Sequence, residues 1–493
     1  MKNHRTFRGL SVIIATLCAT LLLFDTQVFA KFNIHLSSIV WNLLVNPDNG
    51  ELSRDWQIFF APMPIILLIE MLFSRWSWEK LRSLERQKWL KFVGLVLTCT
   101  FIGTHLVYAW ADAFVYRPIT MQRSNFPLSY PMTARTFLEK QGLLDANAYS
   151  QKLAQEGRPD ALKLDYPKHS LKFAPLENKA NLLIITISGL NAKSISAENT
   201  PNLADFAQSS TQFTHHYSTS NNNNAGLVGI FYGLNANYTE SILSHRIASP
   251  LIEKLHKENY QFGLFSADNF KTQLFKQALL RQEKLKSTPS GNAGAIAAAT
   301  QFMTLQTAQK PWFALLDLSL TSRNKADFTA QLAALDHQLG TLFAATDFNN
   351  TLILITSEQG IDFTQNTQNT FSRQQIHVPL LIFWHALPIG EQTQLSSHVD
   401  ILPALMRHLF NLENPISDYA QGQDLFELRG DNWVLAENRR TKLIIQPNGT
   451  QYQLDNHGNV QKFSPTGEAQ KESRPPLGLF LDVLKQESAF FAK

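Results

Sequence analysis

Charged residues are scarce in this chain of 493 residues. Only 17% of them are Asp, Glu, Lys or Arg, whereas 44% are hydrophobic. A charge content this low is unusual for a wholly soluble protein, so membrane segments are expected. The net charge of +4 is small, and no basic stripe is interleaved with aromatic residues. The composition therefore sets nucleic-acid binding aside.

Cysteine is almost absent. Its two copies, Cys18 and Cys99, both lie inside apolar runs near the start of the chain. A large exported domain made from the remainder has no disulfide to stabilise it in an oxidising compartment. It must be held by its hydrophobic core, which a domain of this size can supply.

Three apolar runs, Leu10 to Phe24, Ile58 to Phe73 and Trp89 to Trp110, occupy the first part of the chain. Each approaches the roughly 20 residues that cross a bilayer, although the first two are short. We expect three transmembrane helices. Basic residues precede the first run and separate the second from the third, namely Lys2, Arg5, Arg8, Arg75, Lys80, Arg82, Arg86, Lys88 and Lys91. The positive-inside rule then places everything after Trp110 in the periplasm of a Gram-negative bacterium.

The first run has an alternative interpretation. A basic start, an apolar run and then Val28-Phe29-Ala30 imitate a secretory signal with a small-residue cleavage site. Asp25, Thr26 and Gln27 argue against cleavage because they place a polar stretch before that site. Both interpretations put the large domain outside.

Beyond the runs, Asn181 to Asn191 is the apolar stretch that predicts the fold. Its continuous apolar character is typical of a parallel strand buried on both faces. Later strand candidates alternate with helical patterns such as Phe328 to Ala345, which predicts an α/β domain with a mostly parallel sheet. The strand candidates are Gln212 to Tyr217, Gln261 to Ser266, Trp312 to Leu318, Thr351 to Thr356 and Val378 to Trp384.

The pattern changes near the carboxyl end. Trp433 to Leu454 contains short β runs with an Asn448-Gly449 turn, and Pro475 to Phe491 reads as an amphipathic helix. We therefore expect a transmembrane domain at 1–115, a juxtamembrane linker with short helices at 116–180, the α/β domain at 181–430, and a small region of β hairpins and a helix at 431–493.

The linker after the third run is rich in proline and arginine. We expect a stiff, non-helical segment next to the outer leaflet, in which arginine side chains and backbone N–H groups bind lipid phosphate. The candidate lipid-binding residues are Arg117, Pro118, Thr120, Met121, Gln122 and Arg123. The alternative is a passive spacer.

Several segments in order carry a resemblance. The series Leu182 to Asn191, Ser218 to Gly233, Ile355 to Gly360 and Ser397 to Pro403 resembles the sulfatase-like branch of the alkaline phosphatase superfamily. The segments Arg117 to Arg123, Pro127 to Thr133, Phe231-Tyr232-Gly233 and Gly422 to Phe426 resemble the YejM (PbgA) inner-membrane proteins of Gram-negative bacteria. That family usually has five membrane spans, so this chain corresponds to the family from its third span onward.

The resemblance also implies chemistry that this chain departs from. Ester cleavage in the superfamily needs divalent metal held by carboxylates and His, and a hydroxyl-type nucleophile. Here Ser188, Asn222 and Gln359 stand at the expected ligand and nucleophile positions, and only Glu358 could still bind a metal. The resemblance therefore implies a pseudoenzyme without catalytic residues, metal or cofactor. The alternative is a metal-dependent lipid phosphatase or phosphoethanolamine transferase.

For function, the resemblance implies a sensor of lipopolysaccharide or lipid A that controls lipid A synthesis and envelope homeostasis. The implied partners are lipopolysaccharide, with cardiolipin as a further candidate lipid, and a membrane adaptor of the FtsH protease system. A purely structural envelope tether, without lipid selectivity, is a further class to be tested.

Overall fold

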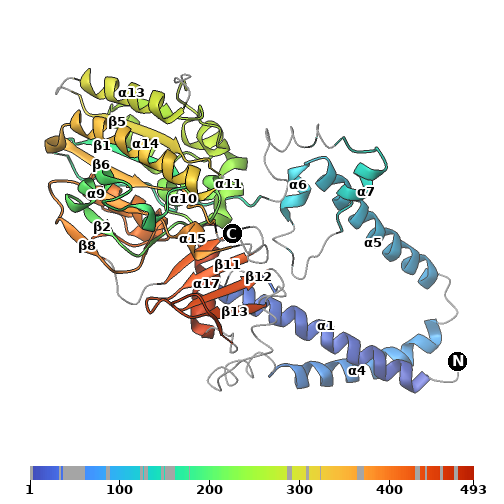
Figure 1. Ribbon diagram of the computed structural model, residues 1–493. Helices are drawn as coiled ribbons and strands as arrows, with labels where there is room; N and C mark the ends of the chain where they lie inside the picture. The colour runs from blue at the N-terminus through green and yellow to red at the C-terminus, as the bar shows by residue number, and fades with distance from the viewer. Residues whose placement is uncertain are drawn as a thin grey trace.

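The computed structural model describes residues 4–32, 35–36, 61–84, 89–122, 126, 132–145, 149, 161–176, 178–285, 291–306, 310–322, 324–363, 371–427, 433–438, 441–455, 459–470 and 476–492. A helical amino-terminal part leads into a larger α/β part, to which a small antiparallel sheet is attached (Figure 1). Of the linker expected at 116–180 to contain short helices, residues 150–160 lie outside the described part of the chain.

Three long helices form the amino-terminal part: α1 (His4–Phe32), α4 (Met63–Leu84) and α5 (Trp89–Ala113). Helices α1 and α4 pack against each other and run in opposite directions (Figure 1). On α5, large apolar side chains point away from the protein, and Phe92 and Phe101 are 67% and 66% exposed. Apolar surface of this extent is expected where a helix faces lipid.

The prediction of three spans is confirmed for only two of them. Among the described residues, the helices long and apolar enough to cross a membrane are Arg8–Ala30 and Lys91–Ala113. Helix α4 forms, but Glu70, Arg75, Glu79 and Lys80 interrupt its apolar run. The predicted apolar run ends at Phe73, but the helix continues through the charged residues Arg75, Glu79 and Lys80.

The central sheet confirms the α/β prediction. Strand β1 (Asn181–Ser188) lies in its middle and pairs in parallel with β5 and β6, and the strand order is β4-β5-β1-β6-β7-β2-β8. Only β7 runs antiparallel to both of its neighbours. The other bounds are β2 (Thr211–Phe213), β4 (Gln261–Ser266), β5 (Trp312–Ser319), β6 (Thr351–Thr356), β7 (Leu380–Phe383) and β8 (Gly390–Gln392).

Helices cover both faces of this sheet, as the unbroken apolar run of β1 requires (Figure 1). Leu182 and Ile184 of β1 face one hydrophobic core, and Leu183 and Ile185 face the other. The first core contains α10 (Asn223–Tyr232), α11 (Thr239–His245), α12 (Pro250–Lys257) and α16 (Ile401–His408). The second contains α9 (Pro201–Gln208), α13 (Gly291–Thr304) and α14 (Lys325–Ala344).

One predicted strand is divided in the structure. The stretch from Gln212 to Tyr217 forms β2 in the central sheet and β3 (His216–Tyr217), which pairs with β9 (Ser396–Ser397) in a separate small sheet. A turn at residues 214 and 215 separates the two strands. This turn directs the chain after Tyr217 toward the start of α10.

The carboxyl-terminal region forms the hairpins that its sequence predicts. Its strands are β10 (Val434–Glu437), β11 (Thr441–Ile445), β12 (Gln451–Asp455), β13 (Val460–Phe463) and β14 (Ala469–Gln470), and α17 (Leu477–Glu487) follows. Gly449 has φ of 80° in the turn between β11 and β12, a conformation that favours glycine.

Buried ion pairs join this sheet to α17, and a hydrogen bond from a backbone N–H connects them to the main domain. Lys442 of β11 pairs with Glu437, 3.0 Å away, and with Glu487 of α17. Glu437 also accepts a hydrogen bond of 2.6 Å from the backbone N–H of Asn237, which follows α10. Because the three ionic groups are largely buried, each depends on the others to remain charged.

We predict that α4 crosses the membrane despite its charges, because α4 and α5 each run back roughly opposite to the helix before them in Figure 1. In a variant whose native Cys18 and Cys99 are replaced by serine, a cysteine at Asn49 should react with an impermeant thiol reagent in intact cells, and one at Glu85 should not. Modification of Glu85 but not Asn49 would reverse the topology. Equal reaction of both sites would show that α4 does not cross.

Candidate functional site

The carboxyl ends of β1 and β6 bring together the positions at which the resemblance predicts chemistry. The backbone N–H of Gly189, just after β1, donates a hydrogen bond of 2.8 Å to the carbonyl of Gln359, just after β6. The Ser188 hydroxyl donates to Oδ1 of Asn223, 3.3 Å away, at the start of α10. We call residues 188–191, 221–224 and 357–360 the strand-end site. The predicted positions Ser188, Asn222, Glu358 and Gln359 all belong to it.

The asparagines at the start of α10 support the local structure. Asn222 is the N-cap of α10, and its side chain accepts a hydrogen bond from the N–H of Ala225. Asn224 accepts one of 2.9 Å from the N–H of Leu274, and Asn221 donates one of 3.1 Å to Gln375. An amide that caps a helix cannot act as a hydroxyl nucleophile.

Glu358 has a buried carboxyl neighbour that the sequence analysis missed. Asp317 lies in β5, where Ser266 and Thr186 donate hydrogen bonds to its carboxylate at 2.8 and 3.3 Å. Glu358 is 1% exposed, and burial raises its pKa to about 7. Burial, and then the charge of Glu358, also raises the pKa of Asp317. Two carboxyls that interact in this way do not both ionise at neutral pH. The sequence feature that could have identified Asp317 is that it is the single acidic residue in an otherwise apolar predicted strand, near the carboxyl end of that strand.

The ligands that a catalytic divalent cation needs are not assembled at the strand-end site. Among the residues that the structure describes, no group of three His, Cys, Asp or Glu side chains could hold a metal ion. The nearby segment after β6 forms α15 (Arg373–Ile376), where Arg373 donates to the Tyr217 hydroxyl and to the Pro465 carbonyl. Hydroxyl and amide groups replace anionic and imidazole ligands, so these residues do not fit the metal.

The histidines near the strand-end site, which are possible general bases by residue type, contribute to local structure instead. His216 is fully buried, and its Nδ1 lies 3.0 Å from the Ser396 hydroxyl. His215 is exposed and bonds the Thr393 carbonyl. Behind them, burial lowers the pKa of His398 to about 3, so this ring remains neutral in the core. These are core and surface residues, as their place beside a strand predicted.

A cavity of about 1520 Å³ opens beside the strand-end site. Asn191, Gln375 and His377 contribute to its wall. Its fixed positive charges come from Lys193, Lys325 and Arg373, against the single carboxylate of Asp362. This balance favours an anionic ligand.

The linker differs from its prediction because it begins with a helical turn, α6 (Arg117–Thr120). Pro118 is tolerated there because it stands in the first turn, whose N–H groups have no partner within the helix. The Arg117 guanidinium donates to the Ser244 carbonyl at 3.2 Å and contacts Nε2 of His245 at 2.9 Å. Both partners lie at the end of α11, so Arg117 joins the end of α5 to the α/β domain.

The tautomer of His245 explains this contact. Its Nδ1 lies 2.9 Å from the Ser241 carbonyl and therefore carries the proton, which leaves Nε2 as an acceptor for Arg117. Burial, and to a smaller extent the charge of Arg117, lowers the pKa of His245. The ring is consequently neutral at pH 7 and suited to accept from a guanidinium.

The remaining candidate lipid-binding residues are divided by exposure. Pro118 and Gln122 are exposed and Met121 is half-buried, whereas Thr120 is buried, with its hydroxyl 3.4 Å from the Tyr116 carbonyl. Arg123 lies outside the described residues, as do the prolines at 127 and 131.

A buried ion pair fixes the next part of the linker. Arg135, the first residue of α7 (Arg135–Lys140), donates two hydrogen bonds of 2.7 and 3.1 Å to Asp112 at the end of α5. Asp112 is 2% exposed, so this contact orients α7 against the end of the membrane helix.

Comparisons with known proteins agree with this architecture. Residues 1–173 match a domain of unknown function, DUF3413, and residues 295–412 match the Sulfatase family. The chain is 60% identical to an uncharacterized protein of Haemophilus influenzae, over 100% of this chain and 86% of that protein. It is 40% identical to the inner membrane protein YejM of Salmonella typhi, over 99% of this chain and 86% of that protein.

A solved structure supports the fold of the large domain. A protein of the alkaline phosphatase superfamily from Vibrio parahaemolyticus superposes with a TM-score of 0.52 at 17% sequence identity. The superposition covers 70% of this chain and 98% of that one.

The buried carboxyl pair leads to a prediction about pH. Because the pKa of Glu358 is raised to about 7, the folded state keeps a proton that the unfolded chain has already lost, and stability falls as pH rises toward 7. From about pH 5 to about pH 7.5, the melting temperature of the full chain in detergent should fall at least about 3 °C further for wild type than for Glu358→Gln. The exposed substitution Glu391→Gln is the control. Parallel curves for wild type and Glu358→Gln would contradict the assignment.

Proposed function

The chain belongs to the family of inner membrane proteins named YejM, and from this premise we propose that it senses lipopolysaccharide through its lipid A part. In this proposal its sulfatase-like domain is a pseudoenzyme that faces the periplasm. The protein would report the lipid's abundance and thereby regulate lipid A synthesis and envelope homeostasis.

The observation that carries the pseudoenzyme proposal is the donor set of the strand-end site. Ser188 bonds an amide, Asn222 caps α10, and Glu358 is buried beside Asp317. Each side chain therefore contributes to local structure. A lipid phosphatase or phosphoethanolamine transferase would need a metal-activated nucleophile at this position.

The contact of Arg117 supports the sensing proposal. Arg117 follows the membrane helix α5 almost directly, and its guanidinium binds the Ser244 carbonyl and His245 of the α/β domain. A lipid phosphate would offer the same guanidinium a charged acceptor, which makes a stronger hydrogen bond than a neutral one. Lipid binding would thus compete with the contact between linker and domain and change how the domain is held.

The output of the sensor would pass through the membrane. We place its partner, a membrane adaptor of the FtsH protease system, against the apolar surface of the amino-terminal helices. Leu10, Ile13 and Leu17 of α1 and Ile65 and Leu68 of α4 are exposed there. Cardiolipin also carries phosphates, so the same arginines are candidates for binding it.

We predict no hydrolytic activity. The full chain in detergent should release no product above a protein-free blank from p-nitrophenyl phosphate, p-nitrophenyl sulfate or phosphatidylethanolamine. This should hold with millimolar Mg²⁺, Mn²⁺ or Zn²⁺, and none of these metals should raise the melting temperature. Metal-dependent turnover that Glu358→Ala abolishes would establish the enzyme instead.

We predict that Arg117→Ala/Arg123→Ala weakens binding of lipid A at least about tenfold, since loss of roughly 1.4 kcal/mol has that effect and each charged hydrogen bond contributes about 1.5–3 kcal/mol. The measurement is a lipid A titration of the detergent-solubilised chain, with a melting curve to confirm folding. Lys140→Ala, which removes an exposed positive charge from α7, is the matched control.

A further variant separates lipid binding from domain docking. His245→Ala removes the ring that Arg117 contacts and leaves the arginine intact. If Arg117 binds phosphate, His245→Ala should keep or increase lipid A affinity. If His245→Ala and Arg117→Ala lose the same amount of lipid A affinity, the role of Arg117 is to hold the linker against the domain and not to bind phosphate. Unchanged affinity in a folded double arginine variant would move the site to the basic cavity lined by Lys193 and Arg373.

A further inference from the structure

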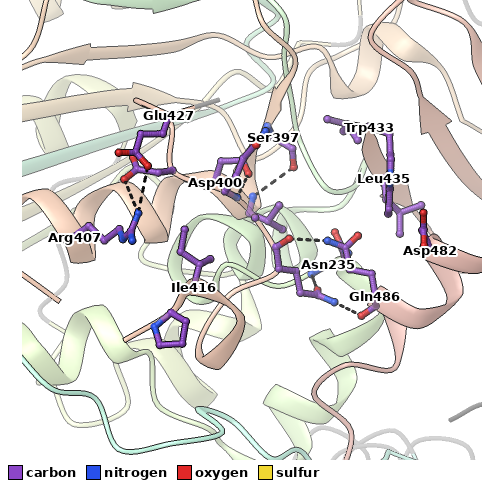
Figure 2. Close-up of a pocket in the computed structure, with 17 residues that line it drawn as sticks. Asn235, Ser397, Asp400, Arg407, Ile416, Glu427, Trp433, Leu435, Asp482 and Gln486 are labelled. Carbon is purple, nitrogen blue, oxygen red and sulfur yellow. Dashed lines mark hydrogen bonds and ion pairs between the residues drawn. The ribbon is translucent and has the colours of Figure 1, made fainter. Parts of the chain in front are cut away.

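A second pocket, of about 710 Å³, lies between the main domain and the carboxyl-terminal sheet (Figure 2). We call it the C-terminal pocket. It is built from five parts of the chain: Asn235 after α10, residues 397–407 around the start of α16, the loop at 415–427, residues 433–435 at the start of β10, and α17. None of its lining residues belongs to the strand-end site.

The charges of the C-terminal pocket exclude an anionic ligand. Among the described residues that line it, four are acidic, Asp400, Asp424, Glu427 and Asp482, and one is basic, Arg407. Arg407 is already paired with Asp424 and Glu427 at 3.5 and 3.7 Å, as Figure 2 shows. A phosphate or sulfate group would meet uncompensated carboxylates here.

The hydrogen-bonding groups argue against a simple cation as well. Asn235 is 2% exposed and lines the pocket, yet its amide nitrogen has no hydrogen-bond partner among the described residues. A donor of this kind requires an acceptor from the ligand, and an ammonium group has none. A hydroxyl group both donates and accepts, so it satisfies an amide and a carboxylate equally well.

Hydrogen bonds within the protein already fix the polar side chains around Asn235 before any ligand binds. Gln421 accepts a hydrogen bond of 2.8 Å from the Asn235 backbone N–H, and Gln421 and Gln486 each donate a side-chain hydrogen bond to the other's carbonyl. Asp400 accepts hydrogen bonds of 2.7 Å from the N–H groups of Ser397 and Gln423. Fixed polar groups of this kind lower the ordering cost of binding.

An aromatic ring completes the arrangement. Trp433 is partly exposed, and in Figure 2 it lies with Asp482 on the side opposite Arg407. The apolar C–H face of a pyranose ring stacks on such an indole, while amides and carboxylates bind the hydroxyl groups at its edge. The volume lies within the range of small-molecule sites.

We propose that the C-terminal pocket binds a neutral sugar of one or two residues, stacked on Trp433 and hydrogen-bonded to Asn235 and Asp482. This site goes beyond the proposed lipid sensing and does not depend on it. The linker and the basic cavity select phosphate by positive charge, whereas this pocket selects hydroxyl groups with its negative and amide groups.

The test uses the full chain in a detergent without a sugar headgroup, because a maltoside would compete. Saturation-transfer difference NMR and calorimetric titration with maltose, cellobiose, lactose and N,N′-diacetylchitobiose should show binding of at least one disaccharide at about millimolar concentration. Trp433→Ala should weaken that binding at least about tenfold and Asp482→Asn about two- to fivefold. Trp76→Ala, which removes an exposed indole from α4, should leave it unchanged.

Three results would overturn the proposal. The first is the absence of binding by all four disaccharides up to about 20 mM, which would mark a solvent-filled pocket. The second is equal binding by wild type and a folded Trp433→Ala. The third is binding of spermidine or inorganic phosphate that Asp482→Asn alters, in place of a sugar. If Trp433→Ala does not fold, Asp482→Asn on the exposed rim decides the question.

Discussion

Burial of β1 on both faces is the constraint on which this structure depends. Its alternate residues enter two separate hydrophobic cores, so helices must cover the sheet from both sides. Parallel strands joined by helices place their carboxyl ends at one edge. The backbone topology therefore brings together the positions of Ser188, Glu358 and the start of α10, regardless of which side chains they carry. The fold thus sets the geometry of the strand-end site, and the side chains at these positions decide what it can bind.

The polar residues at and beside the strand-end site contribute to the stability of the domain. Asn222 caps α10, Ser372 and Gln375 form a capping box, and Arg373 holds the turn at Pro465. Hydroxyl, amide and guanidinium groups at these positions make local hydrogen bonds. A domain stabilised in this way is suited to serve as a rigid body that a membrane segment can hold or release. The Arg117 contact with His245 is where such control would act.

Charge distinguishes the recognition surfaces of the molecule. The cavity beside the strand-end site carries Lys193, Lys325 and Arg373, and the linker carries Arg117. The C-terminal pocket has the opposite balance, and its arginine is already paired. An anionic lipid group and a neutral sugar would therefore bind at different places without competing.

The sequence by itself determined the features that depend on local patterns. These are the apolar run of β1, most later strands, the Asn448-Gly449 hairpin, and the hydroxyl and amide side chains at Ser188 and Gln359, because periodicity and residue chemistry are read along the chain. Tertiary structure decided what depends on neighbours distant in sequence. It placed Asp317 beside Glu358, docked Arg117 on α11, and divided the strand predicted at 212–217. It also assembled the C-terminal pocket from five segments, none of which carries a binding motif, because packing alone brings their polar groups together.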